Sequence, residues 1–219
     1  MSKRTKLIIF SLILLVIAIV YTVLVKTVDV KAIGPKDTSV GFASLNEPVK
    51  NALQYNETFY KISKYLGFLA FGFIGLYGLI GVIQLVREKS IFKVDREIIG
   101  LGVFYVVFLV IYVLFEKIAL NYRPVLMDGE LEASFPSTHT LLALCICGSA
   151  IMVNGKVIKN DLLRRLLNIV AGLLMLGIVV TRVMSGVHWA SDIIGGVIIS
   201  LFLLTALKAF LVEGRPEKH

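Results

Sequence analysis

The chain has 219 residues, of which 57% are hydrophobic and only 17% are charged, and its formal net charge is +8. Soluble proteins contain roughly a quarter charged residues, so this composition argues against a soluble domain. Apolar stretches long enough to cross the ~30 Å hydrocarbon core of a bilayer recur along the chain. The composition therefore predicts an all-α, polytopic integral membrane protein.

Six stretches are expected to span the membrane. They are Leu7–Val25, Leu66–Val86, Ile98–Phe115, Thr138–Val153, Leu166–Thr181 and Ala190–Val212. The first follows three basic residues and resembles a secretory signal, but its apolar run exceeds the roughly 7–15 residues of a signal core. No small-residue cleavage pattern follows it either, so we interpret it as an uncleaved first helix. The six helices are expected to form a single domain over residues 1–219.

The distribution of charge predicts how the helices are oriented. With the N-terminus in the cytoplasm, 14 of the 23 basic residues fall in cytoplasmic segments, among them Arg215 and Lys218 near the C-terminus. The six acidic residues of those segments leave a charge of +8 on that side, while nine basic and nine acidic residues cancel on the outer side. A basic surplus on the inner side is typical of membrane topology. We therefore expect both termini in the cytoplasm and no nucleic-acid partner.

The longest connection, residues 26–65, follows the first span. Its second half is expected to form a short amphipathic helix, with Asn46 as its cap and Pro48 in its first turn. The inward face of this helix would consist of Val49, Ala52, Leu53, Asn56 and Tyr60. Such a helix lies at the outer membrane interface, where it would either help a lipid to reach the protein or cover the bundle.

Two patterns within the spans predict packing rather than chemistry. Small residues that let helices approach closely in lipid recur at Gly72, Gly75, Gly78 and Gly81 of the second span and at Gly195-Gly196 of the last. Cys145 and Cys147 lack the spacing of a C-x-x-C metal or redox pair. They are expected to be small apolar residues of the core.

Three polar segments fall at the predicted outer ends of spans three to six. They are Glu116–Pro124, Ser134–Thr140 and Thr181–Asp192. The topology derived from charge places all three on the same side of the membrane. Ionisable residues at membrane depth are costly and usually mark a functional site.

The third segment predicts phosphoryl chemistry. On one helix, His188 and Asp192 would share a face because they are four residues apart. The carboxylate could then hold one imidazole nitrogen and leave the other free to act as a base or a nucleophile. Arg182, six residues before the histidine, offers the planar charged fork that suits phosphate oxygens.

The second segment is expected at the start of a helix, where free N–H groups and the positive dipole end attract anions. Ser137 would cap this helix and also donate to a phosphate, or it would only cap it. His139, one turn inside, would face the same pocket or be a buried, hydrogen-bonded histidine. We expect both histidines, Asp192 and two arginines to converge in one pocket at the outer rim.

The three segments resemble the signature motifs of the type-2 phosphatidic-acid phosphatase superfamily, which includes bacterial lipid phosphatases and vanadium haloperoxidases. The matching residues are Lys117 with Arg123-Pro124, then Pro136-Ser137-Thr138-His139, then Thr181-Arg182 with His188 and Asp192. The resemblance covers residues 60–212. Three positions depart from the family pattern: five residues rather than six separate Lys117 from Arg123, Thr138 replaces a glycine, and Thr181 replaces a serine.

The resemblance implies a metal-independent hydrolase of membrane lipids without a cofactor. His188 would attack phosphorus, Asp192 would bond its other nitrogen, and His139 would protonate the leaving oxygen. The expected phosphate ligands are Arg123, Arg182, Lys117, Ser137 and Thr138. A metal site would have to use the two histidines and Asp192, where the neighbouring arginines would repel a cation.

The expected substrate is a membrane lipid with a phosphate monoester or diphosphate head at the outer face. Undecaprenyl diphosphate comes first, with phosphatidylglycerophosphate and phosphatidic acid as alternatives, and the compact chain suggests a bacterium. A lipid phosphotransferase of the same superfamily is a second possibility. A transporter or scaffold is a third, although transporters more often have broken helices and charges at the midplane. Nothing in the sequence indicates an obligate protein partner.

Overall fold

The computed structural model describes residues 1–212, which form helices and no β-strand. The α-helices are α1 (Lys3–Thr27), α2 (Ala43–Ala52), α3 (Glu57–Glu88), α4 (Arg96–Lys117), α5 (Thr138–Val157), α6 (Asp161–Met184) and α7 (Ala190–Leu211). Two short 3₁₀-helices, Pro35–Asp37 and Ile91–Lys93, lie in connections. All the α-helices except α2 are long and apolar enough to cross a membrane. The predicted all-α fold with six spanning helices is confirmed.

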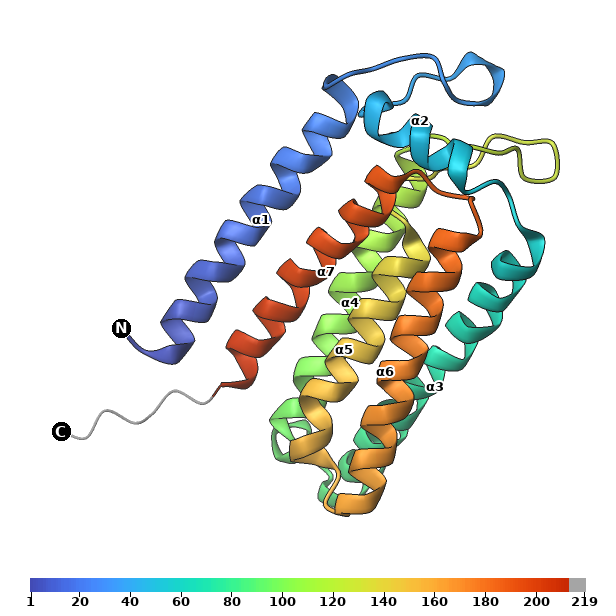
Figure 1. Cartoon of the computed structure of the whole chain (residues 1–219). Helices are drawn as coiled ribbons and strands as arrows, with labels where there is room; N and C mark the ends of the chain where they lie inside the picture. Colours follow the sequence, from blue (N-terminus) through green and yellow to red (C-terminus); the bar gives the residue numbers. More distant parts are fainter. Residues whose placement is uncertain (213–219) are drawn as a thin grey trace.

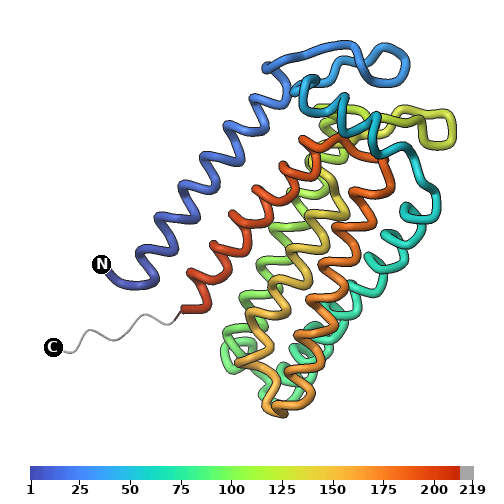
Figure 2. The backbone as a smooth tube through the Cα atoms, viewed as in Figure 1, coloured from blue at the N-terminus to red at the C-terminus, as the bar shows by residue number. Residues whose placement is uncertain are grey.

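The long helices run side by side, with α5 among α3, α4, α6 and α7 (Figure 1). α1 packs against α7 at the edge of the bundle. The connections 28–56, 118–137 and 185–189 gather at one end, called the loop-rich end below. α1 begins and α7 ends at the opposite end (Figure 2). The charged residues Arg215 and Lys218, used to predict the orientation, lie outside the described residues.

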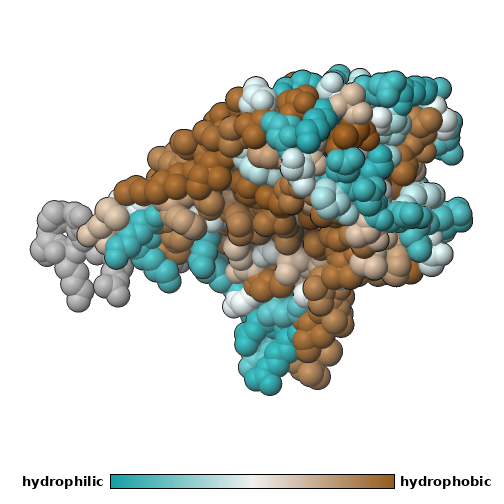
Figure 3. All heavy atoms as spheres, turned by 45° about the horizontal axis from the view of Figure 1, so that its top comes forward, coloured by the Kyte–Doolittle hydropathy of each residue, from teal (hydrophilic) through white to brown (hydrophobic). Residues whose placement is uncertain are grey.

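The hydropathy of the surface changes along the direction of the helix axes. Hydrophobic residues cover the flanks of the helices, while hydrophilic residues gather over the loop-rich end and near the tips of the opposite connections (Figure 3). This band of apolar surface, together with the six long apolar helices, is what a multi-pass membrane protein presents to lipid.

The core of the bundle is built around α5. Leu141, Ile146 and Ala150 of this helix are fully buried, as are both cysteines. Cys145 and Cys147 are free thiols, which agrees with their predicted role as small core residues.

A chain of polar side chains, of which Tyr77 and Asn154 are buried and Asn168 is half-buried, links three helices of the core. The Tyr77 hydroxyl donates to Asn154 Oδ1 at 2.6 Å, and Asn154 Nδ2 donates to Asn168 Oδ1 at 2.7 Å. These bonds join α3, α5 and α6. Such bonds contribute about 1 kcal/mol in membrane proteins.

We expect Asn154→Ala to lower the free energy of unfolding by roughly that amount. The free energy is measured in detergent, with Asn51→Ala as the exposed control. Equal stability of the two variants would contradict the prediction.

The glycines of the second span do not all pack as predicted. A Cβ at Gly72, Gly75 or Gly78 would have no atom within 4 Å, so these glycines face open space on α3. Only Gly81 is close to another helix, with 2.9 Å to Ile98 of α4. The pattern alone could not tell which helical face would be covered. The pair Gly195-Gly196 does pack closely, against the side chain of Phe135 and the start of α5.

The second span begins earlier than predicted. α3 starts at Glu57 rather than Leu66, because the Asn56 side chain caps it by accepting a backbone N–H of the first turn at 3.1 Å. The predicted loop 26–65 is therefore shorter and covers residues 28–56.

The amphipathic helix is present as α2, but it begins at Ala43 instead of at an Asn46 cap. The Asp29 carboxylate accepts the Ser44 backbone N–H at 2.6 Å and supplies the acceptor at the helix start. This hydrogen bond lowers the pKa of Asp29. The helix therefore starts one turn earlier than the sequence pattern suggested.

Asn46 has a different role from the predicted one. It is buried, and its side chain donates to Ser191 Oγ at 2.9 Å and accepts the Ser191 backbone N–H at 3.0 Å. α2 is thereby fixed over the start of α7, which agrees with a covering role (Figure 1). Of the predicted face, Val49 and Ala52 lie in α2, Leu53 follows it, and Asn56 and Tyr60 belong to the start of α3.

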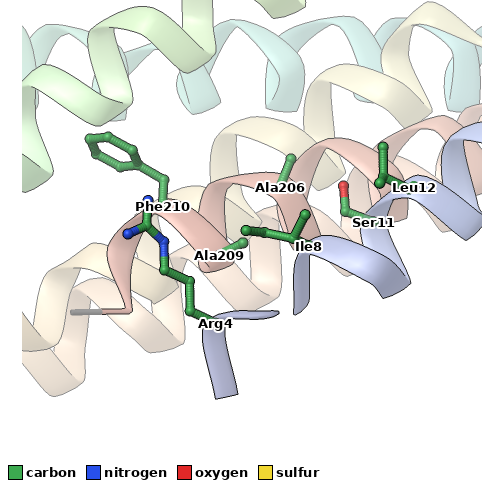
Figure 4. Close-up of a pocket in the computed structure, with 7 residues that line it drawn as sticks. All are labelled: Arg4, Ile8, Ser11, Leu12, Ala206, Ala209 and Phe210. Atoms are coloured by element: carbon green, nitrogen blue, oxygen red, sulfur yellow. The ribbon is translucent and has the colours of Figure 1, made fainter. Parts of the chain in front are cut away.

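A cavity of about 230 Å³ lies between the first turns of α1 and the last turns of α7 (Figure 4). Its lining consists of Arg4, Ile8, Ser11, Leu12, Ala206, Ala209 and Phe210. None of these residues belongs to the three polar segments. This cavity is therefore separate from the site described next.

Candidate active site

The loop 118–137 is folded back on itself and places two of its polar side chains. The Ser134 backbone N–H donates to the Asn121 carbonyl at 2.9 Å, and the Arg123 N–H donates to the Glu132 carbonyl at 3.0 Å. The Trp189 indole N–H donates to a backbone carbonyl of the same loop at 2.7 Å. Arg123 and Ser134 are thus held beside the start of α7.

Ser134 links the histidine and the aspartate of the third motif. Its hydroxyl lies 2.5 Å from Asp192 Oδ2 and 3.1 Å from His188 Nδ1. Because an ionised carboxylate only accepts hydrogen bonds, the hydroxyl donates to Asp192 and accepts from His188 Nδ1–H. The opposite ring nitrogen, Nε2, then carries the lone pair.

The predicted direct bond between Asp192 and His188 is absent. The distance from Asp192 Oδ2 to His188 Nδ1 is 3.8 Å, which is too long for a hydrogen bond. The condition for a shared helical face is not met either, because His188 precedes α7, which begins at Ala190 as predicted for the last span. Asp192 lies in the first turn of α7, and the Ser134 hydroxyl fills the space between the two side chains.

Asp192 is fully buried and is fixed by three donors. Besides Ser134, the backbone N–H of Trp189 donates to its Oδ2 at 2.9 Å and Asn121 Nδ2 lies 3.4 Å from its Oδ1. Several hydrogen bonds to one carboxylate stabilise its ionised form. This carboxylate can therefore fix the orientation of Ser134 and, through it, of His188.

The two arginines come from different elements, Arg123 from the loop 118–137 and Arg182 from the end of α6. Arg182, near the end of α6, is 1% exposed, and its Nη1 donates to Ser63 Oγ at 3.3 Å. Its Cζ atom also lies 5.2 Å from the centroid of the Tyr60 ring. Arg123 forms an ion pair with Glu132 at 3.2 Å.

His139 lies in the first turn of α5 and faces α3. A Cβ at Gly67 would come within 3.4 Å of its ring, so a glycine leaves room for the imidazole at this contact. His139 lines a cavity of about 320 Å³ together with Thr138, between α3, α4 and α5. Toward the middle of the bundle, the walls of this cavity are apolar.

The two histidines do not share that cavity. His188 instead borders a space of about 190 Å³ beside α2, and its side chain is only 1% exposed. The two rings therefore border separate cavities in this structure instead of the single open pocket that was expected, but His139, Arg123 and Arg182 all lie close enough to His188 for their charges to act on it. The physical reason is that Ser134, Asp192 and their neighbours enclose His188, and its Nε2 atom is buried.

Unpartnered polar atoms identify where a ligand fits. Across residues 1–212, six buried side-chain nitrogen or oxygen atoms lack a hydrogen-bond partner, and all belong to the motif segments. They are Asn121 Oδ1, Arg123 Nη1, His139 Nδ1, Arg182 Nε, Arg182 Nη2 and His188 Nε2. Buried polar groups are nearly always paired. Three of these six atoms are guanidinium donors, which is the arrangement that a phosphate group with several oxygens would satisfy.

The electrostatic surroundings keep His188 neutral. Burial is the largest cause, and the charges of Arg182 and Arg123 add to it, so the pKa of His188 lies well below its usual range. His139 contributes in the same direction. A neutral ring with a free Nε2 lone pair can act as a nucleophile.

The predicted phosphate ligands differ in how they are placed. The Ser137 hydroxyl does not cap α5; it accepts from Thr140 Oγ1 at 3.0 Å, while its backbone N–H donates to the Asp192 carbonyl at 3.0 Å. Lys117 is the exposed last residue of α4, and no hydrogen bond or ion pair within residues 1–212 connects it to the other motif residues. Lys117 is the predicted ligand that the fold leaves apart.

Sequence reasoning missed residues of α3 and of the loop before α5. Tyr60 and Ser63 contact Arg182, Gly67 faces His139, and Ser134 connects His188 to Asp192. Ser134 could have been suspected because it lies within the second polar segment. No charge or motif in the sequence marked the α3 residues. Within the described part of the chain, no group of three His, Cys, Asp or Glu side chains is placed to hold a metal ion.

Comparison with known proteins gives concordant results. The sequence model of the PAP2 superfamily matches residues 99–215. The phosphatidylglycerophosphatase B of Bacillus subtilis (strain 168) is 28% identical over 107 residues, which cover 47% of this chain and 48% of that protein. The chain thus aligns with about half the length of this relative.

A crystal structure shares the fold over nearly the whole chain. It is described as the first transmembrane PAP2 type phosphatidylglycerolphosphate phosphatase, from Bacillus subtilis, and it superposes with a TM-score of 0.58. The superposition covers 96% of each chain at 21% sequence identity. The family match includes all three polar segments and more than half of the sequence. The chain therefore belongs to the PAP2 superfamily.

Proposed function

We propose that this protein is a metal-independent lipid phosphatase that works through a phosphohistidine on His188. The observation that supports this most strongly is the set of unpartnered buried atoms on both arginines and both histidines. Their chemistry matches a tetrahedral phosphate, with donors for its oxygens and one neutral imidazole as nucleophile. Family membership supports the same class of reaction.

The proposed reaction has two steps. In the first, His188 Nε2 forms a bond to phosphorus while the bond from phosphorus to the leaving oxygen breaks. The electron pair goes to that oxygen, which takes a proton from His139. In the second, water attacks the phosphohistidine, gives a proton back to His139, and releases orthophosphate and free His188.

The two histidines, Arg123, Arg182, Ser134 and Asp192 are called the cluster below. Its other members stabilise the charges that develop on the phosphoryl group and on His188 during these two steps. Arg123 and Arg182 neutralise the phosphoryl oxygens in the transition state. Asp192, acting through Ser134, keeps the proton on His188 Nδ1 and stabilises the positive charge that develops on the ring. Arg123 can bind a phosphate oxygen through its unpartnered Nη1 while its Nη2 keeps the ion pair with Glu132. The Ser137 hydroxyl and Thr138 are proposed as further phosphate contacts, whereas Lys117 is exposed at the end of α4 and is joined to none of these residues within residues 1–212.

The cavity beside His139 supports a lipid as substrate. Its polar lining residues are Lys64, Tyr112, Thr138 and His139, and the remaining lining residues are Gly67, Phe68, Phe71, Phe108, Leu109 and Leu142. Phe68 and Leu109 are exposed on the flank of the bundle, where the membrane lies. A lipid could therefore place its head group at the loop-rich end while its chains remain beside these apolar walls.

The charge distribution supports placing the loop-rich end at the outer face of a bacterial cell membrane, with both termini in the cytoplasm. Residues 1–219 would form one domain. A phosphate at the outer head-group level is within reach of the cluster. We infer an undecaprenyl diphosphate phosphatase first, with phosphatidylglycerophosphate and phosphatidic acid as the alternative substrates.

Phosphate release from these three lipids tests the proposal. The detergent-purified protein is expected to release orthophosphate from at least one of them at the same rate with and without a metal chelator, because the proposed mechanism uses only protein side chains. Activity that vanishes with chelator and returns with added metal would contradict the mechanism. Binding of all three lipids without phosphate release would instead favour a transporter or scaffold.

A further inference from the structure

Lys64 lies among the α3 residues that surround the cluster. The preceding residue, Ser63, accepts a hydrogen bond from Arg182, and Gly67, one turn later, faces the His139 ring. Lys64 Nζ lies 5.4 Å from the centroid of the Tyr60 ring, which Arg182 also contacts. The first turns of α3 therefore bring a second type of cation to the site.

This lysine is exposed and lines the same cavity as His139. No carboxylate lies within ion-pair distance of it in residues 1–212. By contrast, Lys61 on the preceding turn is paired with Glu57 at 2.8 Å. Lys64 is thus an unpaired cation in a cavity whose other polar side chains, Tyr112, Thr138 and His139, carry no carboxylate.

The position of Lys64 differs from that of both arginines. It lines the same cavity as His139, the proposed acid for the leaving oxygen, whereas neither Arg123 nor Arg182 lines that cavity. A cation on the leaving-group side is useful when the leaving group is itself an anion. That holds for a lipid diphosphate, whose leaving group is a lipid monophosphate, but not for a lipid monophosphate, whose leaving group is an alcohol.

We propose that Lys64 binds the phosphate that remains on the lipid when a lipid diphosphate is cleaved, and so makes the enzyme selective for diphosphates. This inference rests on the proposed phosphatase function. The bond from the terminal phosphorus to the bridging oxygen breaks, and its electron pair stays on the lipid monophosphate. Lys64 neutralises the charge that this leaving group gains.

The test compares two substrates that differ only in the second phosphate, farnesyl diphosphate and farnesyl monophosphate, in detergent micelles. Lys64→Met keeps the length of the side chain and removes its charge. The ratio of kcat/KM for diphosphate over monophosphate is expected to fall about ten- to hundred-fold in this variant, as for the loss of a hydrogen bond to a charged group. Lys61→Met, on the same helix, is the matched control and should leave the ratio unchanged.

Two outcomes would overturn the inference. One is an unchanged ratio in Lys64→Met, whether both activities fall together or neither does. The other is a fall of the ratio in Lys117→Met instead, which would assign this phosphate to the lysine of the family pattern. Failure of the proposed function looks different, because the unmodified protein would then release no phosphate from either substrate.

Discussion

Replacement of His188 by glutamine is expected to abolish phosphate release, with a loss on the order of 10⁴-fold or more, as for other enzymes that lose their nucleophile. Glutamine is similar in size and polar, so the contact with Ser134 can be kept while the nucleophilic nitrogen is lost. The variant should therefore fold normally, which its thermal unfolding midpoint in detergent checks. Retention of more than a few per cent of the activity in a folded variant would remove His188 as the nucleophile.

His139→Gln provides the matched comparison. The proposed role of His139 is to protonate the leaving oxygen, and p-nitrophenolate leaves without that help because it is a stable anion. With a lipid phosphate as substrate, His139→Gln should be much less active than the unmodified protein. With p-nitrophenyl phosphate, its activity should therefore be much closer to that of the unmodified protein, while His188→Gln should be inactive on both substrates. Recovery in both variants, or in neither, would contradict this division of roles.

The fold could be predicted largely from physical constraints that are visible in the sequence. A bilayer of fixed thickness requires long apolar helices, so the six spans could be located from the long apolar stretches of the sequence. The charge distribution then predicted that the three polar segments lie at one end of the bundle, and the structure has all three there. The helix boundaries were less certain, because capping by Asn56 and Asp29 depends on contacts of single side chains.

The composition of the candidate site was less predictable for a related reason. Arg123, His139, Arg182, His188 and Asp192 were predicted because charged residues are conspicuous in apolar sequence. Ser63 and Gly67 are common in membrane helices, so only the packing of α3 against α5 and α6 reveals their contacts. Lys117 illustrates the opposite case, since this lysine matches the family pattern one residue out of register and is exposed at the end of α4.

The Ser134 bridge changes what the family pattern predicts about the third motif. A spacing of four residues between histidine and aspartate suggested direct contact, but that rule applies within a helix. Here the chain enters α7 between the two residues, so their side chains diverge by enough to admit a hydroxyl. Whether the serine takes part in turnover can be decided by comparing its loss with the loss of the aspartate.

Asp192→Asn is expected to reduce kcat by about 10³- to 10⁴-fold, similar to the loss when a histidine-orienting aspartate is neutralised in other enzymes. The neutral amide cannot stabilise the positive charge on His188, and it can donate to Ser134 and so reverse the hydrogen bond. Ser134→Ala should cost about 10- to 100-fold, the usual range for a residue that orients a reactive histidine. Both variants keep the size of the buried side chains close to the original.

The double variant separates the bridge from a direct contact. If Ser134 acts only by connecting Asp192 to His188, the double variant should be no slower than Asp192→Asn alone, because the serine has lost the group whose charge it relays. Ser200→Ala is the matched control, since it removes a buried hydroxyl of α7 that bonds only to the Gly196 carbonyl and to Cys145 Sγ, neither of which belongs to the site. Full activity in Ser134→Ala would mean that Asp192 moves to contact His188 directly during turnover, and it would contradict the bridge as a working part of the site.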